Sequence, residues 1–224
     1  MIHPRCGIRP ASEGTMDGAA ARRGIDWGWV VSNAVLASAL LLFAWTHFMS
    51  WRASGRPTGL GVMVQESVAA VLVMTRHRTA RAARDPLAWL ATAIGSFGML
   101  AARPASSPLA GLQGAWMALQ LLGVAVAVLS LLSLGRSFGL VAAHRGIKTG
   151  GPYRVVRHPV YAGYLLAHLG YLLENPSPHN AALVAVVWSC QLLRIRQEER
   201  FLASDPAYLA YRARVRWRLL PFLY

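Results

Sequence analysis

The segment GGPYRVVRHPVY, residues 150–161, concentrates polar chemistry immediately before an apolar run. Pro159 suits the first turn of a helix, because no backbone hydrogen bond is lost there. A proline also favours an extended conformation in the residue before it, so we expect His158 at the mouth of this helix. The unpaired amides at the helix N-terminus, with Arg157 beside them, predict a binding site for a carboxylate or phosphate.

Two tyrosines and a glycine pair complete this segment. Tyr153 and Tyr161 bracket it with aromatic faces that suit a cationic centre or an adenine. Gly150 and Gly151 allow the backbone to approach a ligand closely. The alternative is a basic loop whose prolines only start a helix, but such a loop requires neither the histidine nor the tyrosines. We therefore interpret the segment as one wall of a cofactor site.

The chain around this segment is strongly apolar. Of its 224 residues, 55% are hydrophobic and only 14% are charged, against about 25% charged residues in a typical soluble domain. The net charge of +14 comes almost wholly from arginine, because Lys148 is the only lysine. A basic soluble protein would suggest nucleic acid, but these basic residues lie between apolar runs, which favours charge-directed membrane topology. We therefore expect an all-α, polytopic integral membrane protein.

Six apolar segments predict about six transmembrane helices. They cover residues 27–49, 60–75, 87–102, 109–134, 159–173 and 180–194. Four of them are shorter than the ~20 residues of a straight span, so tilted or partial spans are an alternative. If the N-terminus is cytoplasmic and all six segments span, 20 of the 23 lysines and arginines lie inside and 3 outside. This bias predicts that both termini face the cytoplasm.

The same reading divides the chain into three regions. Residues 1–24 form a loosely ordered cytoplasmic tail, residues 25–134 a four-helix membrane region, and residues 135–224 a region with the cofactor loop, a helix hairpin and an amphipathic tail. The excess of arginine over lysine, with many alanines and glycines, suggests a GC-rich bacterial genome. We therefore expect localisation in a bacterial inner membrane.

The second wall of the expected site lies at the end of the sixth apolar segment. The turn Asn175–Pro178 predicts an antiparallel hairpin, which brings this end beside His158 on the cytoplasmic face. Arg194 and Glu198 are spaced i, i+4 and project from one helix face. An acid beside an arginine stays ionised and suits a hydroxyl or amino group of a ligand. The alternative is a salt-bridge network that only anchors the helix end.

Polar residues and glycines of the first half have simpler interpretations. Glu66 lies in an apolar segment, where an acid indicates function, but we favour a segment that begins near Gln65 and leaves Glu66 at the interface. We interpret His47 as an interfacial side chain. Four glycines are expected to allow close helix packing: Gly95, Gly98, Gly111 and Gly114.

These motifs resemble the isoprenylcysteine carboxyl methyltransferase family, which is similar to the phospholipid N-methyltransferases. The resemblance covers about residues 130–224 and rests on GPYxxxRHPxY at 151–161, Glu198-Glu199, Tyr208-x-x-Tyr211 and Leu220-Pro221-Phe222. It implies a membrane-bound methyltransferase that uses S-adenosylmethionine. The cofactor pocket would be of a non-Rossmann type, at the cytoplasmic face of the C-terminal half.

The resemblance also implies the functions of individual residues. Those expected to bind the cofactor are Arg145, Gly146, Ile147, Lys148, Tyr153, His158, Pro159, Tyr161 and Glu198. Arg157 suits the methionyl carboxylate, and Arg194 would face the acceptor group as the catalytic residue. Methyl transfer from a sulfonium is a direct displacement, so positioning and charge stabilisation should matter more than an acid–base pair. No metal is expected.

The resemblance leaves the acceptor and two rival functions open. The acceptor would be a lipid or another lipophilic molecule with a carboxylate, thiol or amine, reached from the bilayer. Neither nucleic acid nor an obligatory protein partner is expected. One alternative is a sterol-reductase-like membrane oxidoreductase that uses NADPH. The other is a non-catalytic membrane protein whose basic loops only set topology.

Overall fold

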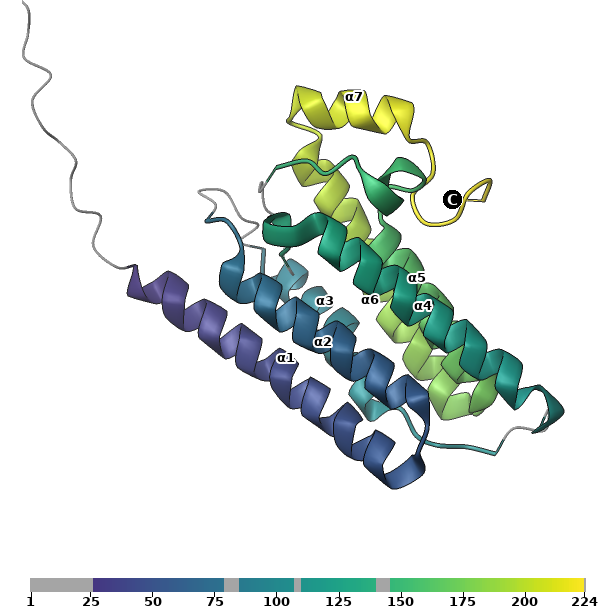
Figure 1. The fold of residues 1–224 in the computed structure, drawn as a ribbon. Helices are drawn as coiled ribbons and strands as arrows, with labels where there is room; N and C mark the ends of the chain where they lie inside the picture. Colours follow the sequence, from purple (N-terminus) through teal and green to yellow (C-terminus); the bar gives the residue numbers. More distant parts are fainter. Residues whose placement is uncertain (1–25, 79–84, 107–109, 140–145, 224) are drawn as a thin grey trace, which may run out of the picture.

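In the computed structural model the chain folds into a helical bundle (Figure 1). The structure describes residues 26–78, 85–106, 110–139 and 146–223. The α-helices are α1 (Trp27–Ser54), α2 (Pro57–Thr75), α3 (Pro86–Phe97), α4 (Gln113–Leu134), α5 (Pro159–Glu174), α6 (Pro178–Leu202) and α7 (Pro206–Arg214). Short 3-10 helices are η1 (Gly98–Ala101), η2 (Ala110–Leu112), η3 (Gly135–Ser137) and η4 (Gly151–Arg154). No strand occurs in these residues, and the all-α prediction is confirmed.

Sequence signals determine where the helices begin. Helices α2, α3, α5, α6 and α7 each carry a proline at their start, where the missing N–H would be unpaired in any case. Four cap side chains accept a hydrogen bond from a first-turn amide: Asp26, Asp85, Ser177 and Asp205. The predicted turn at Asn175–Pro178 separates α5 from α6 as expected.

Three of the described helical runs are long and apolar enough to cross a membrane. They are α1, α2 and the continuous run Gln113–Ser137 of α4 and η3. The apolar run Pro86–Ala101 is shorter. On α1, the large side chains of Leu42 and Trp45 are 66% and 56% exposed, as expected for a helix that contacts lipid. The chain is therefore a membrane protein, while six spans and the orientation of the termini stay predictions.

Helix α5 packs most extensively on α4, and glycines make this approach possible. A Cβ on Gly123 would lie 2.4 Å from the backbone nitrogen of Ala167. A Cβ on Gly163 would lie 2.6 Å from the backbone nitrogen of Ala127. Both distances are far below van der Waals contact, so only glycine fits. Such small-residue contacts are typical of membrane helices, although neither glycine was among those expected from the sequence.

The glycines of α3 and η1 serve a similar purpose against α6. A Cβ on Gly98 would lie 2.7 Å from the side chain of Val187, and Gly95 is also closely covered by α6. The expected close packing at Gly95 and Gly98 is therefore confirmed. At Gly111 and Gly114 it is wrong, because no described heavy atom would lie within 4 Å of an added Cβ.

The C-terminal segment closes one end of the bundle. In Figure 1, α7 (yellow) lies beyond the end of α6 and above η4. The backbone N–H of Arg157 donates to the carbonyl of Trp217 at 2.9 Å, and that of His158 donates to Arg218 at 2.8 Å. These bonds hold the entry to α5 against the residues that follow α7.

The α4–α5 contact gives a direct test of the packing. Gly123→Ala is expected to lower the melting temperature of the detergent-solubilised protein, because overpacking of this kind destabilises by about 1–3 kcal/mol. Gly114→Ala, on the same helix, is the matched control. It should be neutral or stabilising, because alanine favours a helix over glycine by about 1 kcal/mol. Equal destabilisation by both variants would contradict the packing.

Candidate active site

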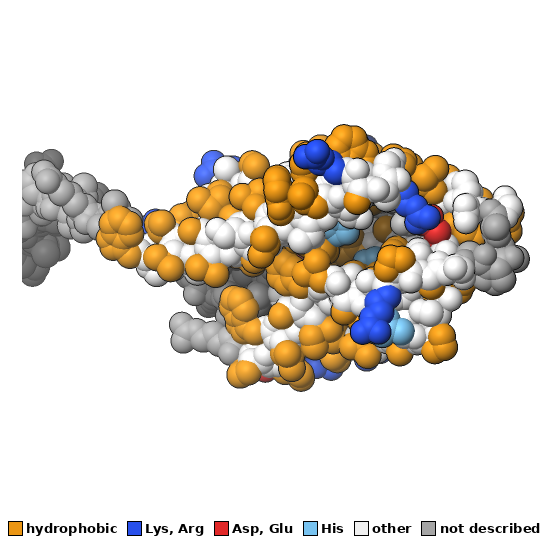
Figure 2. Space-filling model, turned by 90° about the horizontal axis from the view of Figure 1, so that it is seen from below, with side chains coloured by type: hydrophobic (Ala, Val, Ile, Leu, Met, Phe, Trp, Pro, Cys, Tyr) orange, Lys and Arg blue, Asp and Glu red, His pale blue; other side chains and the backbone are white. Residues whose placement is uncertain are grey.

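A cavity of about 910 Å³ lies between the helices. Ligand pockets usually have volumes of about 300–1,000 Å³, so this cavity is large enough for a sizeable ligand. Side chains from α1 to α6 and from η4 form its walls. Figure 2 views the molecule from the end opposite α7 and shows a hollow with histidine side chains inside it. The segment 150–161 contributes to the wall, as the sequence predicts.

Helix η4 positions Tyr153 in this wall. Gly151 has φ 58°, a left-handed conformation that glycine adopts without steric penalty. The hydroxyl of Tyr211, on α7, donates to the carbonyl of Tyr153 at 2.8 Å. Burial, followed by the negative charge of Glu198, raises the pKa of Tyr153 well above its usual value. Tyr153 therefore presents a neutral phenol to the cavity.

Glu199 is the centre of a charge network behind the wall. Its Oε1 accepts a hydrogen bond from Arg157 Nε at 2.9 Å, and its Oε2 accepts one from Arg218 Nε at 2.9 Å. His158 Nε2 lies 3.3 Å from Oε1. Burial alone would raise the pKa of Glu199, but the interaction with His158 and the charges of both arginines outweigh burial and lower the pKa to about 2. The ionised carboxylate thus joins α6, the entry to α5 and the C-terminal segment.

Arg157 makes more protein contacts than the sequence suggested. Besides its bond to Glu199, its Nη1 donates to the carbonyls of Val215 and Arg216, both at 3.1 Å. The residue is buried, yet it still lines the cavity. Its charge is balanced largely by Glu199, so its clearest function is to support the wall. Its expected contact with a ligand carboxylate stays a prediction.

Glu198 has a different environment from its neighbour. Its side chain is 37% exposed, against 8% for Glu199, and it lines the cavity. Glu198 Oε2 lies 3.9 Å from His158 Nδ1. The two adjacent acids therefore have different functions. Glu199 stabilises the fold, and Glu198 is accessible to a ligand.

Arg194 lies one helical turn before Glu198, and both line the cavity. Its Nη1 donates to Gln191 Oε1 at 2.8 Å and to Ser96 Oγ, on α3, at 3.4 Å. Its guanidinium carbon lies 5.3 Å from the centroid of the Tyr161 ring, within cation–π range. The predicted common face of Arg194 and Glu198 is confirmed, and α3 fixes the direction of the arginine.

Comparison with known proteins finds relatives for the part of the chain that contains these residues. Residues 113–205 match the family model described as phospholipid methyltransferase.

This region is similar to the phospholipid methyltransferases.

Two curated relatives agree with the match. Protein-S-isoprenylcysteine O-methyltransferase A of Arabidopsis thaliana is 37% identical over 79 residues, which are 33% of this chain and 40% of the relative. Protein-S-isoprenylcysteine O-methyltransferase B of the same plant is 31% identical over 103 residues, 42% of this chain and 52% of the relative. The chain thus spans about half or less of the length of these relatives.

The methyltransferase-family region contains the predicted site residues, and many of them line the cavity. Those that line it are Tyr153, Arg157, His158, Tyr161, Arg194 and Glu198. Pro159 is buried at the first position of α5, and Ile147 packs on the cluster of Tyr153, Tyr208 and Tyr211. Gly146 has φ 90°. Gly146, Ile147, Lys148 and Pro159 are not among the lining residues, and Arg145 lies outside the described residues.

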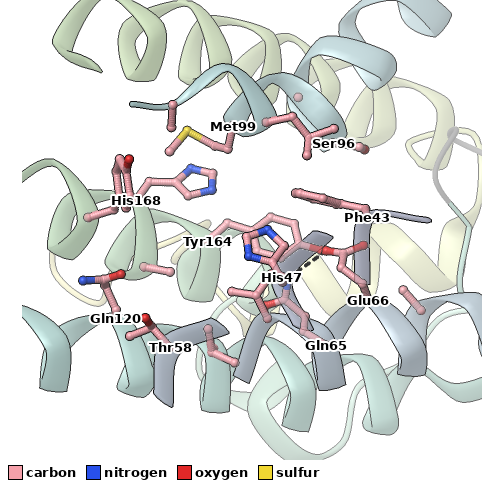
Figure 3. A pocket seen from close by; sticks show the side chains of 18 of the residues that line it. Phe43, His47, Thr58, Gln65, Glu66, Ser96, Met99, Gln120, Tyr164 and His168 are labelled. Atoms are coloured by element: carbon pink, nitrogen blue, oxygen red, sulfur yellow. Dashed lines mark hydrogen bonds between the residues drawn. The ribbon is translucent and has the colours of Figure 1, made fainter. Parts of the chain in front are cut away.

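Helices α1, α2 and α5 supply cavity residues that were not predicted for the site. His47 from α1, Gln65 and Glu66 from α2, and Tyr164 and His168 from α5 all line the cavity (Figure 3). The interfacial interpretation of Glu66 is wrong, because α2 begins more than two turns earlier and buries this residue. His47 also lines the cavity. The available signal was an acid within an apolar segment.

The two adjacent acids provide a matched pair of variants. Glu199→Gln is expected to destabilise the protein by about 3 kcal/mol, because it leaves buried Arg157 without its counter-charge. Glu198→Gln should change stability by less than about 1 kcal/mol. Thermal unfolding in detergent measures both, and equal effects would contradict the assignment.

The pH dependence follows from the lowered pKa of Glu199. The pKa falls from 4.5 to about 2 on folding, so ionised Glu199 contributes stability above pH 4.5. This contribution is lost as the pH falls from about 4.5 towards 2. The melting temperature of the wild type should therefore fall more steeply over this interval than that of Glu199→Gln. Parallel curves would contradict the network.

Proposed function

We propose that the protein transfers a methyl group from S-adenosylmethionine to a lipophilic acceptor in the membrane. One observation carries the proposal: the segment 150–161 and the pair Arg194 and Glu198 both contribute side chains to one large cavity between apolar helices. The proposed orientation places both termini in the cytoplasm, in a bacterial inner membrane. The cofactor then enters from the cytoplasm near α7, and the acceptor enters from the bilayer.

The chemistry of the lining residues supports this cofactor. S-adenosylmethionine carries a carboxylate, an amino group, ribose hydroxyls, an adenine and a sulfonium. Glu198 suits the amino group or a hydroxyl, and the N-terminus of α5 with Arg157 suits the carboxylate. The rings of Tyr153 and Tyr161 suit the adenine or the sulfonium. In this proposal His158 orients Glu198, from which its Nδ1 is 3.9 Å away.

The remaining predicted residues complete the proposed cofactor site. Arg145, Gly146, Ile147 and Lys148 precede η4 in the chain, and we propose that they bind the cofactor. Ile147 already packs on the tyrosine cluster that supports η4. Pro159 fixes the first turn of α5 and so the direction of its amides.

When bound, the cofactor supplies a methyl group on a positively charged sulfur. The protein then has to position the acceptor, exclude water and balance charge. We assign Arg194 to the acceptor side, because Gln191 and Ser96 hold its guanidinium in the cavity. The two relatives act on a protein-S-isoprenylcysteine, as their names state. For this chain a carboxylate, thiol or amine on a lipophilic acceptor would suit the proposal.

Calorimetry on the detergent-solubilised protein tests the cofactor. S-adenosylmethionine and its demethylated product are expected to bind, and NADPH is not. Glu198→Ala and His158→Ala should weaken binding by about tenfold or more, because each removes a charged or polar contact worth about 1.5–3 kcal/mol. The neighbouring variant Gln197→Ala is the control and should bind as the wild type does. Binding of NADPH instead, or of neither molecule, would overturn the proposal.

A further inference from the structure

The cavity holds a second polar cluster that the cofactor motifs do not use. It consists of His47, Gln65, Glu66, Tyr164 and His168, and Figure 3 shows these side chains around the same space. Two of the three helices that supply it, α1 and α2, lie outside residues 113–205. His47, Gln65 and Glu66 therefore belong to the part of the chain that the family match does not reach.

Glu66 differs from the other buried acids. Glu199 is paired with arginines, and Glu174 lies 3.1 Å from Arg56 Nη1. For Glu66, the hydrogen bond is from Gln65 Nε2 to Oε1 at 3.1 Å, and no basic side chain in the described part of the chain forms an ion pair with it. Burying a carboxylate without a counter-charge raises the free energy of the folded protein. Within a membrane protein, such a group is retained for function.

A second group in the cluster has an atom without a hydrogen-bond partner among the described residues. The Nδ1 atom of His168 is buried, and no described atom forms a hydrogen bond with it. Figure 3 shows its imidazole pointing into the cavity. Phe43 and Met99 line the space between the polar groups. The cluster thus offers unused polar atoms beside apolar surface, which suits a lipophilic molecule with a polar group.

Tyr164 links this cluster to the proposed transfer site. Its ring lies edge-on to that of Tyr161, with centroids 6.3 Å apart. It also stacks on His168, with ring centroids 6.3 Å apart. The ring of Tyr161 in turn lies 5.3 Å from the guanidinium carbon of Arg194. A molecule held at Glu66 would therefore lie in the part of the cavity that faces the proposed acceptor residue.

We propose that Glu66 binds the nucleophilic group of the methyl acceptor and accepts its proton, so that the acceptor is an amine, a hydroxyl or a thiol. This inference rests on the proposed function. A bond forms from the methyl carbon to nitrogen, oxygen or sulfur, and the bond from that carbon to the sulfonium breaks, with its electron pair left on sulfur. The N–H, O–H or S–H proton passes to the Glu66 carboxylate.

A carboxylate acceptor fits this arrangement poorly. It carries no proton that must be removed, so Glu66 would have no function in its methylation. Its negative charge would also be repelled by Glu66 in a medium of low dielectric constant. Arg194 would attract it, but Arg194 would not remove the repulsion from Glu66, and no proton would pass to Glu66. The Glu66 cluster therefore favours an acceptor that loses a proton.

Label transfer to a membrane lipid extract tests the inference. The detergent-solubilised protein is incubated with the extract and methyl-labelled S-adenosylmethionine, and the product is treated with alkali. A methyl ester, formed from a carboxylate, releases volatile methanol. A methyl amine, methyl ether or methyl thioether keeps its label. We expect the label to stay non-volatile. Glu66→Gln should reduce transfer by about 100-fold, the usual effect of losing a general base, and Ser67→Ala, on the same helix and outside the cavity lining, should not.

The outcomes separate this inference from the proposed function. S-adenosylmethionine should bind Glu66→Gln as tightly as the wild type, which also shows that the variant is folded. If the wild type binds the cofactor but the label is released as methanol, or if Glu66→Gln transfers at the wild-type rate, the inference is wrong and the proposed function stands. If the wild type does not bind the cofactor, the proposed function itself fails.

Discussion

The buried carboxylate of Glu199 is the interaction on which the site depends. Removing a carboxylate from water is unfavourable, and here two arginines and a histidine compensate for it. The partners come from the entry to α5 and from the C-terminal segment, while Glu199 belongs to α6. Three segments far apart in sequence are thus held at one end of the bundle. Because adjacent residues on a helix point about 100° apart, Glu198 is turned to the cavity when Glu199 is buried.

Close helix contacts shape the rest of the cavity. The glycines at the α4–α5 contact bring the backbones together, and Gly95 leaves room for the side chains of Gln191 and Arg194. Polar groups are then held in place by α3 and α6, even though the surrounding helices are apolar. In a medium of low dielectric constant such fixed charges act strongly on a bound molecule. The cavity therefore combines a lipid-compatible exterior with an organised polar interior.

Particular residues show how far the sequence could be read. The apolar segments, Pro159 and the turn at Asn175–Pro178 predict helices close to the observed ones, since these signals act within a few residues. The family resemblance and the spacing of Arg194 and Glu198 located the C-terminal wall. The sequence does not predict whether Arg157 pairs with Glu198 or with Glu199, because the two acids are chemically alike. The sequence does not predict the burial of Glu66, because Gly59 and Gly61 disfavour a helix although α2 begins at Pro57.

The sequence by itself determined the all-α class, the membrane character and the resemblance of the C-terminal half to membrane methyltransferases. These properties depend on composition, on local helix signals and on short motifs, all of which are encoded within neighbouring residues. Only the tertiary structure decided which of two adjacent acids is buried, and that α1 and α2 contribute Glu66 and His47 to the same cavity as the methyltransferase-family motifs. Those facts depend on how helices distant in sequence pack, because burial and charge pairing arise only when the helices meet.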